Sequence, residues 1–153
     1  MTPYGVDTDA SGSRVYVTDH IKHEVMVFGP RGNLLSSFGG PGVLPGRFLK
    51  PAGVAVGPDG TVFVADRCNR RIQHFTADGR FLDSFGSLVL ETPTFLAVDD
   101  TGDVFVADHH RVLRFGQGRG MVARAANHDG VDIQCRHVAE MVLGDGLPAG
   151  IGD

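Results

Sequence analysis

A short apolar motif recurs three times along the chain, and this repeat constrains the fold more than any other feature. It occupies residues 15–19 (VYVTD), 62–66 (VFVAD) and 104–108 (VFVAD), so its aspartates lie 47 and 42 residues apart. A proline stands 15 or 16 residues before each of these aspartates, at Pro3, Pro51 and Pro93. A period of this length indicates a solenoid, a propeller or another array of similar units packed side by side.

The second copy of the repeat is the most complete and predicts four short strands. They cover residues 53–56, 62–65, 71–75 and 80–85, and Gly79 supplies the turn between the last two. The first two strands are apolar at nearly every position, whereas a strand with one wet face would alternate. We therefore expect each sheet to be covered on both faces, as in a blade of an all-β propeller.

The second copy also resembles the NHL repeat family. The resemblance rests on residues 51–56 (PAGVAV), the Asp-Gly turns at 59–60 and 78–79, and residues 62–66 and 69–75. It extends over residues 3–118, as an arc of about three four-stranded blades at about 3–40, 48–87 and 92–118. The third copy is two residues shorter between its aspartate and Phe115, and no fourth strand is visible after it.

The resemblance implies a propeller of six blades, so three blades make an incomplete ring. An open arc leaves apolar blade faces and unpaired strand edges, which invite association. The chain is therefore either a fragment of a longer propeller protein or a chain that self-associates through its open blade faces. Residues 119–153 lie outside the repeat and are expected to form a short helix at 131–143 or an irregular tail.

Composition limits the class of partner and the location of the chain. The formal net charge is −4, which does not fit a dedicated nucleic-acid binder. The N-terminus shows no signal peptide, and no apolar run reaches the roughly 18 residues of a membrane helix. We expect no membrane association and a location that is cytoplasmic or undetermined. Two distant cysteines build neither a disulfide framework nor a zinc-binding RING.

The segment after each repeated aspartate is basic, and repeat symmetry places all three on one rim of the arc. These loops could bind a protein partner, another ligand or, less favourably, RNA, because aromatic residues for base stacking are absent from them. The candidate binding residues are His20, Lys22, His23, Arg67, Asn69, Arg70, His109, His110 and Arg111. We expect structural roles for Asp19, Asp66, Arg71 and Asp108. The loop histidines are expected to be exposed rather than to form a metal site.

An enzyme function is the alternative to a binding scaffold. The chain is also distantly similar to the propeller of the peptidyl-α-hydroxyglycine α-amidating lyases. That resemblance implies zinc-binding histidines directly after the proline that opens a blade, but Tyr4, Ala52 and Thr94 stand there. We find no catalytic constellation and expect no cofactor or metal. We therefore predict a non-catalytic scaffold, with a fragment of a propeller lyase or lactone hydrolase as the alternative.

Overall fold

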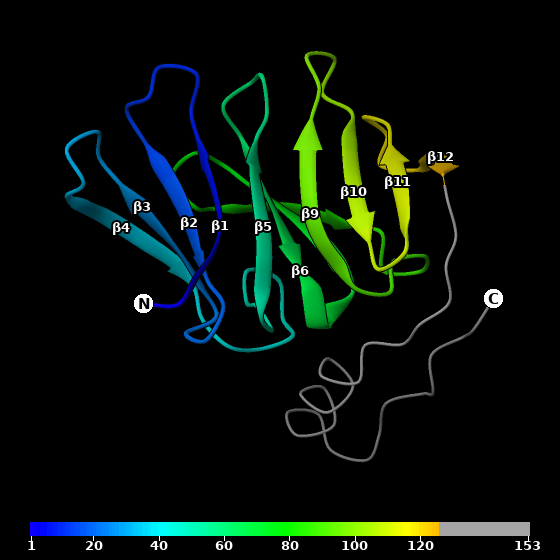
Figure 1. The fold of residues 1–153 in the computed structure, drawn as a ribbon, viewed down its shortest axis with the longest axis horizontal. Helices are drawn as coiled ribbons and strands as arrows, with labels where there is room; N and C mark the ends of the chain where they lie inside the picture. Colours follow the sequence, from blue (N-terminus) through cyan, green and yellow to red (C-terminus); the bar gives the residue numbers. More distant parts are fainter. Residues whose placement is uncertain (126–153) are drawn as a thin grey trace.

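The computed structural model describes residues 1–125, which fold into three four-stranded antiparallel sheets, each with its strands paired in chain order (Figure 1). The first blade contains β1 (Pro3–Thr8), β2 (Val15–Asp19), β3 (Glu24–Phe28) and β4 (Leu34–Gly39). The second contains β5 (Pro51–Val56), β6 (Val62–Asp66), the 3-10 turn η1 (Arg67–Asn69), β7 (Arg71–Phe75) and β8 (Phe81–Phe85). The third contains β9 (Pro93–Val98), β10 (Val104–Asp108), β11 (Arg111–Phe115) and β12 (Met121–Ala125). The predicted arc of three four-stranded blades is confirmed.

The first strands of the three blades, β1, β5 and β9, lie side by side and form the inner side of the arc. Two glycines permit this close approach. A Cβ atom at Gly5 would lie 2.6 Å from the carbonyl oxygen of Ala52, and one at Gly53 would lie 2.7 Å from that of Thr94. The repeated glycine therefore sets the spacing between neighbouring blades.

Apolar contacts between blades explain why the repeat strands are apolar at every position. All five residues of β6 are buried, because the second blade packs between the other two. One core cluster lies between the first and second blades and includes Tyr16 and Phe75. Another lies between the second and third blades and includes Phe63 and Phe115. The middle blade is thus buried on both faces, while each outer blade keeps one face open.

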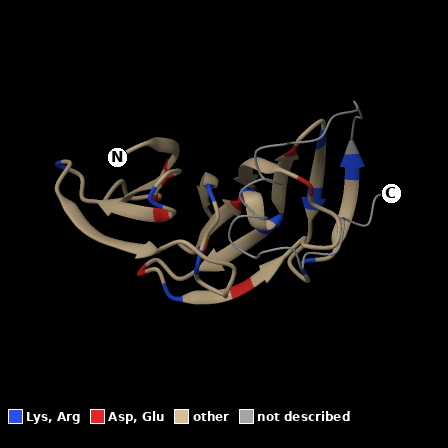
Figure 2. Cartoon of the chain, turned by 90° about the horizontal axis from the view of Figure 1, so that it is seen from below, with Lys and Arg blue, Asp and Glu red and all other residues tan. Residues whose placement is uncertain are grey.

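The arc does not close within the described residues. Seen from below, the three blades follow one another along an open curve (Figure 2). Within residues 1–125, β1 packs against β5 and β5 packs against β9. One sheet face of the first blade and one of the third therefore lack a neighbouring blade.

The end of the third blade differs from the sequence expectation. Residues from 119 onward were expected to lie outside the repeat, but β12 pairs with β11 and completes the blade. Residues 121–124 are exposed. Because neither face of this strand is buried, its sequence needs no alternating or continuous apolar pattern by which the strand could be predicted. The predicted helix at 131–143 lies outside the described residues. Within residues 1–125 no helix is long and apolar enough to cross a membrane.

Candidate binding rim

The three basic loops lie at the same edge of the arc. In each blade the aspartate at the end of the second strand pairs with the proline that opens the first strand. Because the strands are antiparallel, the loop after each aspartate lies beside the start of an inner strand. We call the edge formed by residues 20–23, 67–70 and 109–111 the basic rim. It contains all nine candidate binding residues.

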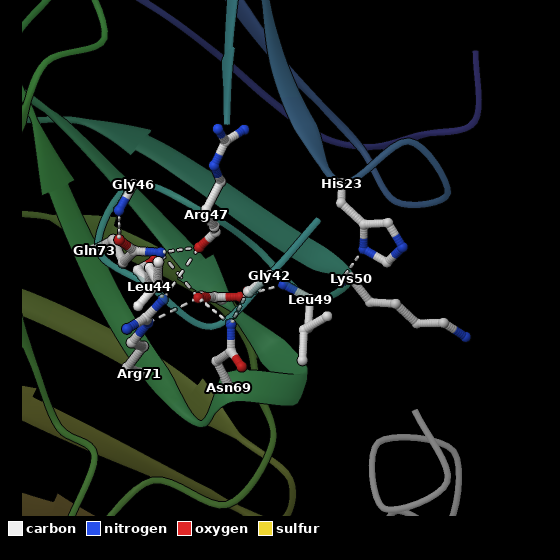
Figure 3. Close-up of polar contacts among 11 residues, drawn as sticks. His23, Gly42, Leu44, Gly46, Arg47, Leu49, Lys50, Asn69, Arg71 and Gln73 are labelled. Carbon is white, nitrogen blue, oxygen red and sulfur yellow. Dashed lines mark hydrogen bonds and ion pairs between the residues drawn. The ribbon is translucent and has the colours of Figure 1, made fainter. Parts of the chain in front are cut away.

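Asp66 holds the second blade together at this rim. Its side chain is fully buried and accepts four hydrogen bonds of 2.8–2.9 Å. The donors are the backbone N–H of Leu49, Nδ2 of Asn69, Nε of Arg71 and Nε2 of Gln73 (Figure 3). Burial raises the pKa of Asp66, and these donors oppose that effect. Asp66 therefore fastens β6 to β7 and to the segment before β5.

The loop between the first two blades is fastened to the same network. Nη2 of Arg71 donates to the carbonyl oxygens of Leu44 and Arg47, both at 3.1 Å. Nε2 of Gln73 donates to the same Arg47 oxygen at 2.6 Å, and Nδ2 of Asn69 donates to that of Gly42 at 3.0 Å. Figure 3 shows these side chains converging on the loop. The candidate binding residue Asn69 is thus engaged inside the blade.

Asp19 occupies the equivalent position in the first blade, where its donors within residues 1–125 are backbone groups. It accepts hydrogen bonds from the N–H groups of Thr2, Ile21 and Lys22 at 2.9–3.1 Å. Burial acts to raise the pKa of Asp19, but these backbone donors outweigh it and hold the pKa below its ordinary value. The carboxylate therefore fixes the turn that carries Lys22.

Asp108 repeats the arrangement in the third blade. It is fully buried and accepts the backbone N–H groups of Glu91 and Thr92, the latter at 2.7 Å. Nε of Arg111 donates to it at 3.0 Å, and the same guanidinium also bonds the carbonyl oxygen of Val89. The candidate binding residue Arg111 thus takes the place that Arg71 has in the second blade.

The rim histidines of the first blade are also engaged. Nδ1 of His23 accepts the backbone N–H of Lys50 at 2.8 Å, and Nδ1 of His20 lies 3.3 Å from the carbonyl oxygen of Pro51. Burial lowers the pKa of His20, and the charges of Lys50 and Arg67 lower it further. Two cationic groups of the second blade therefore act on His20 of the first blade.

Two aromatic residues that the sequence analysis did not assign to the rim lie beside it. The ring of Tyr4 stacks on His20 at a centroid distance of 5.0 Å and on Phe95 at 5.8 Å. Tyr4 is 40% exposed and Phe95 is 55% exposed. The sequence signal was available, because Phe95 stands where the other two inner strands have Gly5 and Gly53.

The remaining rim residues are Lys22, Arg67, Arg70, His109 and His110. Lys22 and His109 are exposed, and the other three are half-buried. His109 and His110 contact each other edge to face, with ring centroids 4.9 Å apart. Within residues 1–125 no three His, Cys, Asp or Glu side chains gather in a way that could hold a metal ion. The arrangement of this rim fits binding through cationic and aromatic side chains.

Three antiparallel four-stranded blades that meet at their inner strands define an arc of a β-propeller. Within this class, residues 48–75 match the family model described as the NHL repeat. The match covers the loop before β5 and strands β5 to β7. It therefore includes the part of the chain in which Asp66 organises the rim.

Known relatives and one solved structure agree with this fold. Protein brain tumor of Drosophila melanogaster is 36% identical over 89 residues, which cover 52% of this chain and 9% of that protein. The probable peptidyl-alpha-hydroxyglycine alpha-amidating lyase pgal-1 of Caenorhabditis elegans is 32% identical over 131 residues, 76% of this chain and 37% of that protein. Hydrazine synthase of Kuenenia stuttgartiensis shares the fold with a TM-score of 0.69 at 15% identity, over 84% of this chain and 36% of that one. The chain thus spans at most 37% of these proteins.

Proposed function

We infer that this chain is a non-catalytic propeller scaffold whose basic rim binds an acidic segment of a protein partner. The observation that supports this most directly is that two cationic side chains of the second blade, Lys50 and Arg67, act on His20 of the first blade, 3.3 Å from the Pro51 carbonyl oxygen, and lower its pKa. Exposed Lys22 lies on the adjacent turn. A surface of one charge sign attracts carboxylate groups and orients an approaching partner.

The acidic residues of the rim do not cancel this charge at its surface. Asp19, Asp66 and Asp108 are fully buried, and their carboxylates are occupied by donors within each blade. Glu91 lies 3.7 Å from the guanidinium of Arg111, with which it forms an ion pair. Glu24, which directly follows the loop of the first blade, is half-buried. The accessible surface of these two loops is therefore mainly basic.

A charge-reversal experiment tests the proposal. Peptides selected from a random phage-displayed library on the wild-type chain should be enriched in Asp and Glu, and their binding should weaken with rising salt. The double variant K22E/R70E should weaken the best peptide about tenfold or more, because charge reversal at a rim slows association and removes attraction. The matched control R31E/R80E changes two exposed arginines in the turns at the opposite edge and should leave binding within about twofold. Equal effects of both variants, or selected peptides without acidic residues, would refute the proposal.

RNA binding is the second candidate, and the exposed aromatic rings favour it. Single-stranded RNA is held by base stacking together with cationic grooves. Tyr4 and Phe95 place stacking surfaces beside the basic rim. If RNA is the ligand, a fluorescent 12-nucleotide RNA should bind at low salt and lose affinity in Y4A, whereas the selected acidic peptides should bind Y4A as they bind wild type.

A further inference from the structure

One histidine of the second blade is buried and has a ring nitrogen without a hydrogen-bond partner. His74 on β7 is 8% exposed, and its ring stacks on Phe63 of the neighbouring strand β6 at a centroid distance of 4.1 Å. Its Nε2 lies 2.6 Å from the hydroxyl oxygen of Thr61. Within residues 1–125 its buried Nδ1 makes no hydrogen bond, although a carboxylate oxygen of Asp83 on β8 lies 3.4 Å away. Buried polar atoms are normally hydrogen-bonded, so this nitrogen calls for an explanation.

The turn between β5 and β6 determines which nitrogen of His74 carries the proton. The hydroxyl of Thr61 donates to Oδ1 of Asp59 at 2.7 Å. The third blade has the same turn without a histidine, and there the hydroxyl of Thr101 donates to Asp99 at 2.6 Å. Because the turn uses the hydroxyl proton, the Thr61 oxygen accepts from His74, and Nε2 carries the proton of the neutral ring. Nδ1 therefore presents a lone pair toward the carboxylate on β8, and a second proton would bind there.

A cation of the third blade contacts the same aromatic ring. The guanidinium of Arg119, in the turn between β11 and β12, lies over the rings of Phe63 and Phe85, 4.9 and 5.4 Å from their centroids. Its Nη1 also donates to the carbonyl oxygen of Gly102 at 3.2 Å. Cations are attracted to the faces of aromatic rings. Arg119 therefore clamps the last hairpin of the third blade onto the second blade.

The backbone of Arg119 is held in a conformation that favours glycine. Its φ is +61°, in the left-handed region. The equivalent residues of the first two blades are Gly32 and Gly79, with φ of 81° and 87°, and the same pair of backbone hydrogen bonds closes all three turns. Glycine adopts this conformation at little cost, whereas an arginine is held there by the contacts of its side chain. Loss of those contacts should therefore open the turn.

We propose that protonation of His74 releases the Arg119 clamp, so that the hairpin of β11 and β12 loosens from the second blade in acid. Three charged side chains face the ring within residues 1–125: Asp83 on β8, Asp59 in the β5–β6 turn, and Arg119. Burial and the charge of Arg119 lower the pKa of His74, and the two carboxylates oppose them. The ring is therefore neutral near pH 7 and takes up its second proton at Nδ1 as the pH falls. A cationic ring stacked on Phe63 then repels the guanidinium that lies over the same ring.

Nuclear magnetic resonance of the 153-residue chain tests the proposal with two measurements. The ring signals of His74 report its titration, and hydrogen exchange of the Gly116 and Arg119 amides, corrected for the intrinsic effect of pH, reports the opening of the turn. From about pH 7.5 to pH 5 the opening should increase about tenfold and follow the titration of His74. The variant R119Q should raise the pKa of His74, because it removes the nearby positive charge. The matched control R31Q, at an exposed position in the equivalent turn of the first blade, should leave that pKa unchanged.

Two further variants separate this switch from a general effect of acid. H74N retains His20 and His23, and its turn opening should stay within about twofold over the same pH range. R119G places in the third blade the residue of the other two turns, so it should fold with an unchanged circular dichroism spectrum and show no effect of pH on the turn. Three results would overturn the proposal: a wild-type turn that is insensitive to acid, an equal increase of opening in H74N, or a pKa of His74 that is the same in R119Q and in the wild-type chain.

Discussion

Replacement of Gly53 by alanine should push the second and third blades apart. The new Cβ atom would lie 2.7 Å from the carbonyl oxygen of Thr94 and 2.9 Å from the Cα of Phe95. Both are backbone atoms, which no rotamer change can move aside. Ordinary contact begins near 3.4 Å, so β5 and β9 must separate by roughly 0.7 Å.

Overpacking of this kind costs about 1–3 kcal/mol in a packed interior. For a chain of this size the melting temperature should fall by about 5–15 °C. Thermal unfolding followed by circular dichroism measures the shift, with G118A as the matched control. No heavy atom lies within 4 Å of a Cβ placed at Gly118, so that change should be neutral or stabilise by up to about 1 kcal/mol. If G53A melts within 1 °C of the wild-type chain, the inner strands do not pack as described.

Three further predictions concern the packed middle blade and its polar groups. F75A removes a ring that is 1% exposed between the first two blades, and it should destabilise the chain by about 3–5 kcal/mol in urea unfolding. Y16F removes the hydrogen bond from the Tyr16 hydroxyl to the Ala77 carbonyl oxygen and should lower the free energy of unfolding by about 0.5–1.5 kcal/mol. The control Y4F should lower it by less, because the Tyr4 hydroxyl makes no hydrogen bond within residues 1–125. Burial lowers the pKa of His74 in the folded chain, so the unfolded chain binds protons more readily and stability should fall as the pH drops from about 7 to 5. H74N should weaken that pH dependence and leave a remainder from His20 and His23, whose pKa values burial also lowers; an unchanged dependence would contradict the assignment.

The strands that could be predicted from the sequence are those whose residues are buried in the same way in every repeat. Strands such as β6 are apolar at each position before the final aspartate because both faces are covered, and the aspartate recurs because it ends the same strand in each blade. β12 could not be predicted, because its first four residues are exposed and only its pairing with β11 defines it. The contribution of Tyr4 and Phe95 to the rim depends on a ring contact between β1 and β9, the strands on either side of β5, about 90 residues apart in the chain.

The contacts of the loop that joins the first two blades also could not be predicted from the sequence. Its carbonyl oxygens at Gly42, Leu44 and Arg47 are bonded by side chains of β7 and η1 that follow 24–27 residues later. No local pattern in the loop predicts these partners, because the acceptors are backbone atoms that any sequence provides. The sequence therefore predicts Asn69 as a binding residue and gives no sign that its side chain is hydrogen-bonded within this network.

Hydrogen exchange of the 153-residue chain, followed by mass spectrometry, tests the three-blade arc most directly. We expect the slowest exchange in β6 and β7, because the middle blade is buried on both faces, and fast exchange in the outermost strands β4 and β12. Equal exchange rates in β6 and β4, or fast exchange throughout β5 to β7, would show that the blades do not pack on one another as described.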